Sequence, residues 1–303
     1  MKQTSIYRLI LPVMALLLGA SCSDWTETET IDNTVRKPWE QDPVLWADYT
    51  AALRSYKASE HYLSYARLHN SPSPAASEQD FMRCLPDSLD IVTLTNADNF
   101  STYDAEDMAV MREKGTRVLY QVDYAARKAE FSTETALKAY LDGVIASVAA
   151  NGLDGYSFTT DPLDAVATAS IVATLSAAKT DGQLLVFEGN PLSVAAADRE
   201  KLDYVVLDTE TAENTTDVRL QVLNATGYAG IPAERLLLAA EIDKPLQDAD
   251  RTEYAAVERM AQCVVEFGPL AGFAAYNIAG DYYHAEMNYQ TIRTAIQTLN
   301  PSK

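Results

Sequence analysis

Cysteine, histidine and basic residues are scarce in this sequence. Its 303 residues include three cysteines and three histidines, and 24 Lys and Arg stand against 43 Asp and Glu, for a formal net charge of −19. So few cysteines exclude a disulfide scaffold, and the widely separated histidines form no paired zinc-ligand motif. We therefore expect neither a metal nor a cofactor. The acidity argues against a nucleic-acid partner, because negative side chains repel phosphate groups.

Two common catalytic motifs are also missing. The sequence has no Gly-x-Ser-x-Gly turn and no Gly-x-x-x-x-Gly-Lys-[Ser/Thr] loop. Their absence argues against the usual serine hydrolases and nucleoside triphosphatases. The remaining composition, 48% hydrophobic and 22% charged, is that of an ordinary globular chain and excludes wholesale disorder.

The first residues have the layout of a secretory signal. Lys2 and Arg8 are followed by the apolar stretch Leu9–Leu18, by small residues and then by Cys22. The apolar stretch is shorter than the ~20 residues that span a bilayer. A cysteine directly after small residues resembles a bacterial lipobox, and a plain cleaved signal is the alternative. We expect a lipoprotein signal peptide over residues 1–21 and lipidation of Cys22, which would become the mature N-terminus.

Residues 22–38 are polar, acidic and rich in threonine, which predicts a flexible tether. The acidic stretch after the cysteine resembles the export signal of Bacteroidetes surface lipoproteins, and a simple soluble linker is the alternative. The resemblance implies a lipid-anchored protein of the outer membrane that is exposed on the cell surface. We expect the ordered domain to cover residues 39–303.

Within that domain, short apolar runs alternate with stretches of helical period. The runs are 62–68, 90–95, 117–122, 155–159, 184–187, 204–207, 236–240 and 272–278, and the clearest helical stretches are 104–114, 133–150, 163–179, 216–228, 252–267 and 285–299. Eight such repeats in about 260 residues predict a single-domain α/β fold, the (β/α)8 TIM barrel. A doubly wound open sheet is the alternative, but the first run is not followed by the glycine-rich turn of such folds.

Polar residues follow every predicted strand, where the active face of a barrel lies. Carboxylates and amides hydrogen-bond sugar hydroxyls, and aromatic rings pack on the apolar faces of sugars. We therefore predict a glycan-binding face. Its expected contacts are Asn96, Gln121, Asp161, Asp208, Glu241, Tyr276 and Asn277. Ordinary loop polarity and structural ion pairs are the alternative explanation for these residues.

The fourth predicted strand carries the most informative segment. It reads Asn-Gly-Leu-Asp-Gly-Tyr-Ser-Phe-Thr-Thr-Asp from Asn151 to Asp161. This resembles the D-x-x-D-x-D-x-E signature of glycoside hydrolase family 18, the chitinases and endo-β-N-acetylglucosaminidases. Asp154 occupies its first position, while Ser157 and Thr159 replace the second and third aspartates and Asp161 replaces the glutamate. Residues 81–92, 272–278 and 289–301 also resemble segments of Bacteroidetes members of that family, so the resemblance covers most of the folded chain.

The substitutions imply a degenerate catalytic motif. The family's glutamate protonates the glycosidic oxygen, and its third aspartate orients the substrate N-acetyl group, whose oxygen acts as the nucleophile. Asp161 is one methylene shorter than glutamate, and Thr159 cannot stabilise the developing positive charge. Misplacement by about 1 Å and loss of such electrostatic support each reduce a rate by ~10²-fold or more. We therefore expect no catalytic residue, with Asp161 or Glu241 as the fallback acid. A helix N-cap is the structural alternative for Asp161, because Pro162 follows it.

These observations predict a non-catalytic surface protein that binds N-acetylglucosamine-containing glycans, such as N-glycans, during polysaccharide utilisation. Its expected partners are the glycan, an outer-membrane transporter and glycosidases. An active hydrolase of endo-β-N-acetylglucosaminidase type is one alternative. A structural or assembly lipoprotein of a glycan-uptake complex is the other, since a fold does not by itself determine function.

Overall fold

The computed structural model describes residues 36–75 and 77–301; the expected signal peptide, Cys22 and most of the expected tether lie outside them. The chain divides into two compact units, Met1–Trp46 and Ala47–Lys303. The described part of the first contains helix α2 (Pro38–Gln41) and the start of α3 (Pro43–Ala58). In it, the rings of Trp39 and Trp46 lie 5.7 Å apart. No helix within the described residues is long and apolar enough to span a membrane.

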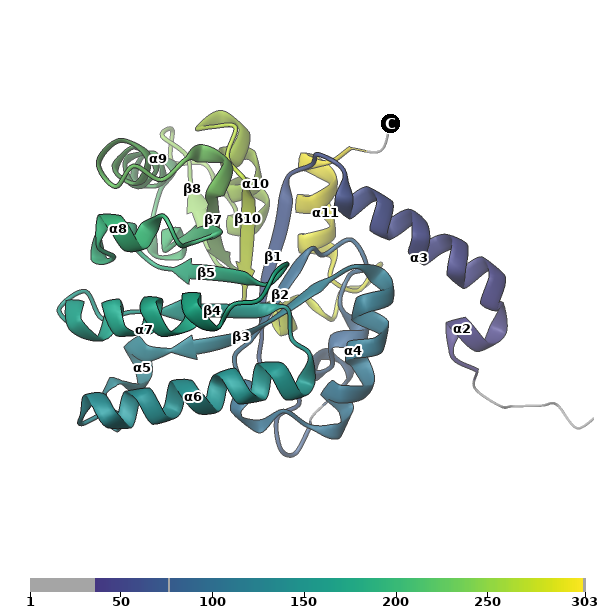
Figure 1. The fold of residues 1–303 in the computed structure, drawn as a ribbon. Helices are drawn as coiled ribbons and strands as arrows, with labels where there is room; N and C mark the ends of the chain where they lie inside the picture. Colours follow the sequence, from purple (N-terminus) through teal and green to yellow (C-terminus); the bar gives the residue numbers. More distant parts are fainter. Residues whose placement is uncertain (1–35, 76, 302–303) are drawn as a thin grey trace, which may run out of the picture. The chain divides into compact units, whose positions relative to one another are not determined.

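The second unit contains a closed parallel barrel of eight strands (Figure 1). The strands are β1 (Leu63–Leu68), β2 (Ile91–Leu94), β3 (Arg117–Asp123), β4 (Gly155–Thr159), β5 (Leu184–Glu188), β6 (Tyr204–Leu207), β7 (Leu236–Glu241) and β10 (Gly272–Tyr276). Neighbours along the chain are neighbours in the barrel, and β10 pairs with β1 to close it. The predicted TIM barrel is confirmed, and each strand lies within two residues of its predicted bounds.

Helices follow most of the strands and cover the outside of the barrel (Figure 1). They are α4 (Thr102–Lys114), α5 (Tyr124–Arg127), α6 (Glu134–Asn151), α7 (Ala165–Ala178), α8 (Ala196–Arg199), α9 (Thr215–Leu223), α10 (Ala256–Glu266) and α11 (Gln290–Leu299). Short 3-10 turns lie between many of these elements, and a π-helical turn at Asn224–Tyr228 extends α9.

Several helix boundaries differ from the sequence prediction. Residues at the start of the predicted helix 252–267 instead pair as an antiparallel hairpin, β8 (Pro245–Gln247) with β9 (Glu253–Ala255). The helix over 163–179 begins only at Ala165, because Asp164 caps it by accepting a hydrogen bond from the Ala167 N–H. The last helix begins at Gln290 rather than at residue 285.

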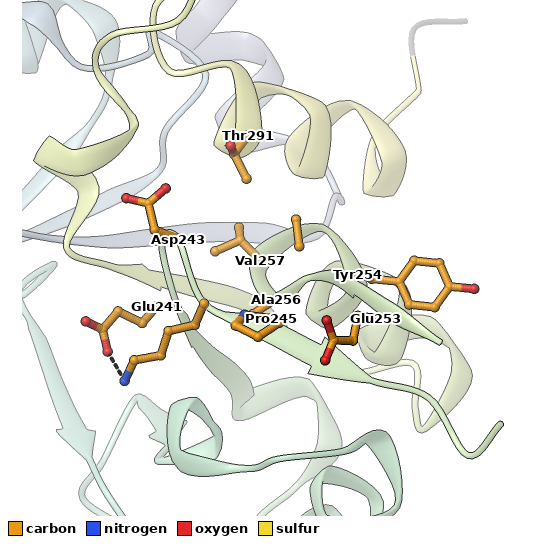
Figure 2. A pocket seen from close by; sticks show the side chains of 10 residues that line it. Glu241, Asp243, Pro245, Glu253, Tyr254, Ala256, Val257 and Thr291 are labelled. Carbon is orange, nitrogen blue, oxygen red and sulfur yellow. Dashed lines mark ion pairs between the residues drawn. The ribbon is translucent and has the colours of Figure 1, made fainter. Parts of the chain in front are cut away.

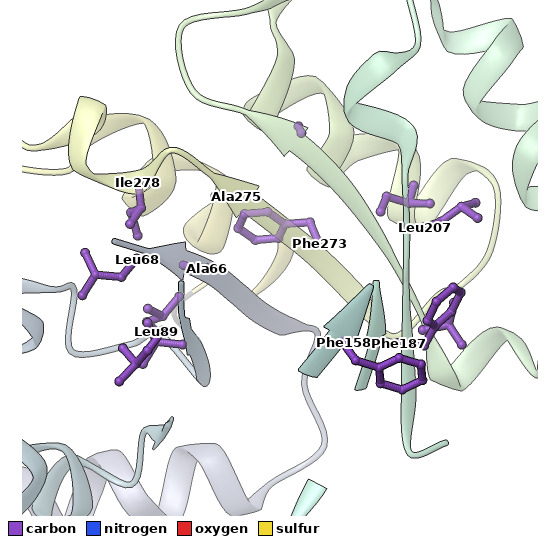
Figure 3. Close-up of a cluster of buried hydrophobic side chains, with 14 of the residues drawn as sticks. Ala66, Leu68, Leu89, Phe158, Phe187, Leu207, Phe273, Ala275 and Ile278 are labelled. Carbon is purple, nitrogen blue, oxygen red and sulfur yellow. The ribbon is translucent and has the colours of Figure 1, made fainter. Parts of the chain in front are cut away.

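Strand alternation divides the core into two layers, as the two-residue period of a β-strand requires. One set of side chains points outward against the helices, and Figure 3 shows Leu68, Phe158 and Phe273 among them. The other set fills the barrel, and its buried apolar members are Tyr65, Ile91, Leu119, Val186, Val206, Leu237, Ala239, Ala274 and Tyr276. The last inward residue of each strand therefore determines the chemistry of the barrel mouth.

Candidate functional site

An ion pair crosses the barrel at its mouth. Nε of Arg67 on β1 donates to Glu188 at the end of β5. These two strands are four places apart around the ring of eight, so the pair spans the interior rather than its wall. The Glu188 side chain is fully buried, and that of Arg67 is 26% exposed. Burial by itself would lower the pKa of Arg67, but Glu188, Tyr276 and Tyr65 together outweigh this effect, so the pKa is raised.

Three further side chains complete this cluster around Glu188. The Tyr65 hydroxyl donates to it at 2.7 Å, the Gln121 amide at 3.2 Å and the Tyr276 hydroxyl at 3.4 Å. The guanidinium of Arg67 lies 3.5 Å from the centroid of the Tyr276 ring, a cation–π contact. Burial, followed by the nearby Glu188 charge, raises the pKa of both tyrosines. We call these five residues the mouth cluster; they are Tyr65, Arg67, Gln121, Glu188 and Tyr276.

The degenerate motif of β4 is engaged in bonds within the protein. Asp154 accepts a hydrogen bond from the Val118 N–H at 2.8 Å and so links β4 to β3. The buried hydroxyl of Ser157 is 2.6 Å from that of Thr93 on β2. Thr159 donates to Asp123 at 2.7 Å. The polar groups at these positions therefore stabilise the barrel wall and its rim.

Asp161 lies on the rim in an ion pair with Lys128. Its carboxylate accepts from Lys128 Nζ and from the Leu163 N–H, both at 2.8 Å. These two hydrogen bonds, the lysine first, lower the pKa of the carboxyl. A general acid needs the opposite shift. Asp161 is also not the helix cap that the sequence allowed, because Asp164 has that role.

The pKa values of two carboxyl groups after β6 shift in the direction opposite to that of Asp161. Burial raises the pKa of both Asp208 and Glu210. One carboxylate oxygen of Glu210, Oε2, is buried and has no hydrogen-bond partner among the residues that the structure describes. Arg67 partly offsets the shift at Glu210, whereas the negative charges of Asp208 and Glu188 add to it. Sequence reasoning counted Glu210 only as one of many strand-end polar residues.

Another part of the rim lies beside β7 and β10. Glu241 forms an ion pair with Lys244. Across the paired strands β7 and β10, Glu241 lies opposite Tyr276, and the next residue after Tyr276 is the exposed Asn277. A pocket of about 340 Å³ opens next to Glu241 (Figure 2). It is lined by Glu241, Asp243, Lys244, Pro245, Glu253, Tyr254, Ala255, Ala256, Val257 and Thr291. We call it the β7 pocket.

The predicted contact residues thus fall into separate groups. Gln121 and Tyr276 lie together in the buried mouth cluster, where Arg67 occupies a face of the tyrosine ring. Asn96 donates to the Asn70 carbonyl at 2.8 Å on another part of the rim. Asp161 and Asp208 belong to the two groups above, while Glu241 and Asn277 are neighbours at the ends of paired strands. The prediction that these seven residues contact a ligand stays a prediction.

Sequence analysis missed Arg67. Arg67 lies inside an apolar run, which predicts a strand but does not single out this residue as part of a functional site. The available signal was its two-residue spacing from Tyr65, which places both side chains inside the barrel. The Asp243 carboxylate in the β7 pocket was recognised as a strand-end acid but was not among the predicted contacts.

Comparison with known proteins agrees with this architecture. Residues 26–156 match the model of glycoside hydrolase family 18, BT1044-like. This family 18-like segment includes Asp154 and Gly155 and stops one residue before Ser157, so Thr159 and Asp161 lie beyond it. No curated protein matches the sequence.

Solved structures of low sequence identity share the fold. A glutamate-to-glutamine variant of BT1044 is 16% identical with a TM-score of 0.70, covering 88% of this chain and 96% of its own. The endo-β-N-acetylglucosaminidase of Cordyceps militaris is 16% identical with a TM-score of 0.63, covering 84% and 96%. YKL-39, solved in the presence of chitooligosaccharides, is 10% identical with a TM-score of 0.61, covering 80% and 100%.

Proposed function

We propose that this protein is a non-catalytic glycan-binding domain with a family 18-like barrel. The observation that carries the proposal is the state of Asp161. It stands at the position of the family's acid, but Lys128 holds it as a carboxylate with a lowered pKa. Thr159, at the position of the aspartate that assists the substrate, carries no charge and is bonded to Asp123. Neither group can perform its family role in this arrangement.

The glycan part of the proposal rests on family and chemistry. The family match implies a ligand that contains N-acetylglucosamine, with N-glycans as the specific example. The rim retains accessible carboxylate and amide groups at Glu241 and Asn277, and such groups pair with sugar hydroxyls. We propose that this rim holds the glycan while other proteins act on it.

The expected location completes the proposal. Lipidation of Cys22 would anchor the domain in the outer membrane, and residues 22–38 would hold it away from the lipid. A surface position suits capture of glycans for glycosidases and an outer-membrane transporter. These partners follow from the lipoprotein resemblance in the sequence.

Hydrolysis is the second candidate function, and one observation favours it. Glu210, which follows β6, combines a raised pKa with a buried carboxylate oxygen that no group in the described part of the chain hydrogen-bonds. A carboxyl group whose pKa is raised by burial is what a general acid requires. If the protein hydrolyses glycans, we therefore expect Glu210 to be the acid rather than Asp161 or Glu241.

One pair of assays separates these functions. Purified protein should bind N-glycans in calorimetry and release no product from chitooligosaccharides or N-glycoproteins between pH 5 and 7. Product release that Glu210→Gln abolishes and Asp161→Asn leaves intact would establish the hydrolase instead. Absence of both glycan binding and product release would favour the assembly lipoprotein.

A further inference from the structure

Every tryptophan of the chain lies close in sequence to the expected anchor. The three are Trp25, Trp39 and Trp46, and the second unit, Ala47–Lys303, contains none. Tryptophan is enriched at the boundary between lipid and water, because its ring is apolar and its N–H needs a polar partner. The distribution therefore points to the first unit as the part of the chain that contacts lipid.

The described part of the first unit presents large apolar side chains to solvent. Val44 is 72% and Leu45 is 66% exposed, both in the first turn of α3. The neighbouring rings of Trp39 and Trp46, 5.7 Å apart, are also partly exposed. We call these four residues the N-terminal apolar group. Apolar side chains that are exposed together mark contact sites for proteins or membranes, whereas single ones are ordinary.

The charges of this segment do not oppose contact with a membrane. Between residues 36 and 46, two basic residues balance two acidic ones, although the whole chain has a net charge of −19. Both carboxylates accept backbone N–H groups at helix starts: Glu40 from Lys37 at 2.9 Å, and Asp42 from Leu45 at 3.0 Å. A neutral segment avoids the repulsion that an anionic lipid surface exerts on the rest of this acidic chain.

The expected anchor would keep the N-terminal apolar group next to the bilayer. Only residues 23–35 separate Cys22 from Arg36, and a stretch of that length reaches at most about 50 Å. A short tether gives a second, weak contact an effective concentration of the order of millimolar, so a modest apolar contact is enough.

We infer that the N-terminal apolar group lies in the lipid–water interface of the membrane that holds Cys22. The inference rests on the proposed lipid anchor and adds a second point of attachment to it. The tether then ends in a segment that touches the bilayer, and only the residues after Trp46 are held away from it. The two attachments together fix the distance from the lipid at which the second unit starts.

Tryptophan fluorescence tests this contact directly. The purified lipoprotein with Trp25→Phe retains only Trp39 and Trp46 as tryptophan emitters. After reconstitution into phosphatidylcholine vesicles, its emission should shift to shorter wavelength relative to the unlipidated Cys22→Ala variant. Brominated phosphatidylcholine in the same vesicles should quench that emission, because bromine quenches only rings that enter the bilayer.

Matched double variants identify the side chains responsible. Val44→Ser with Leu45→Ser should remove most of the quenching, and the exposure of both side chains means that the variant should fold. Leu163→Ser with Val166→Ser is the control, because these residues of the second unit are 93% and 75% exposed. The control should be quenched like the parent protein.

Each outcome decides a different claim. A parent protein that does not enter vesicles overturns both the lipid anchor and the inference. Incorporation without quenching overturns the inference alone and leaves the glycan proposal untouched. Equal quenching of the Val44 and Leu45 double variant also overturns it. An emission shift that depends on protein concentration and not on vesicles would mean that a second copy covers the apolar group instead. Quenching of parent and control that this double variant loses supports the inference.

Discussion

Arg67 reaches from β1 to Glu188 on the opposite side of the barrel and lies on the ring of Tyr276 as it does so. The sequence predicts Tyr276 as a glycan contact whose ring would pack on a sugar. In this structure the guanidinium occupies a face of that ring. The contacts that stabilise the barrel mouth therefore include the ring that the sequence assigned to a sugar.

The first prediction concerns this ion pair. Arg67→Ala leaves a fully buried Glu188 carboxylate without its cation, and it should lower the free energy of unfolding by about 3 kcal/mol. Urea denaturation measures the loss. Arg117→Ala is the control, because this arginine is exposed at the start of β3, and it should lose less than about 1 kcal/mol. Replacing both partners, as Arg67→Met with Glu188→Leu, should recover most of the stability. Equal losses in Arg67→Ala and Arg117→Ala would contradict a stabilising role for the Arg67–Glu188 ion pair.

Glu210 should make the protein less stable at neutral pH. Burial raises the pKa of Glu210 in the folded protein above its value in the unfolded chain. Above the folded-state pKa the ionised carboxylate therefore destabilises the folded state, and below the unfolded-state pKa this loss of stability disappears. Glu210→Gln should therefore increase the free energy of unfolding at pH 7 by about 1 kcal/mol. The gain should shrink towards zero near pH 4, about the pKa of an unperturbed glutamate. Urea denaturation between pH 4 and pH 7 measures this change, with Glu234→Gln at an exposed position as the control. A gain in unfolding free energy that does not depend on pH would show that the charge of Glu210 is not the cause.

Two glycine-to-alanine substitutions should have opposite effects. Gly155 has φ +136°, and a Cβ there would lie 2.1 Å from the Leu184 carbonyl oxygen, so Gly155→Ala should prevent the pairing of β4 with β5. We expect a loss of more than about 3 kcal/mol or failure to fold. Gly143 lies within α6 with no atom near its Cβ position, so Gly143→Ala should gain about 0.5–1 kcal/mol. Thermal unfolding of both variants distinguishes them, and a tolerated Gly155→Ala would mean that the strands pair differently.

The fourth prediction concerns the expected anchor. Cys22→Ala should convert a detergent-partitioning lipoprotein into a soluble or uncleaved species, because the cysteine would carry the acyl chains. Phase partitioning of cell extracts measures this, with Cys84→Ala as the control, since Cys84 is a free cysteine in the folded unit. Aqueous partitioning of the parent protein would remove the lipoprotein assignment.

Sequence patterns predicted the strands and their order well. The apolar runs from residue 62 to residue 278 all became barrel strands, because a buried strand must present apolar side chains at fixed intervals. The helix starts were less accurate. The sequence analysis assigned β9 to the start of a helix because this strand is only three residues long, too short for a two-residue period to appear.

Several features were determined by the sequence alone: the strand–helix alternation that gives the barrel, the strand-end polar residues and the broken β4 motif. Only the tertiary structure decided what those polar residues contact. It joined Arg67 to Glu188, residues 121 apart in sequence, and paired Asp161 with Lys128. The physical reason is that local periodicity tells which way a side chain points from its strand. Which opposite side chain it meets, and therefore its pKa and its availability to a ligand, depends on closure of the barrel around one axis.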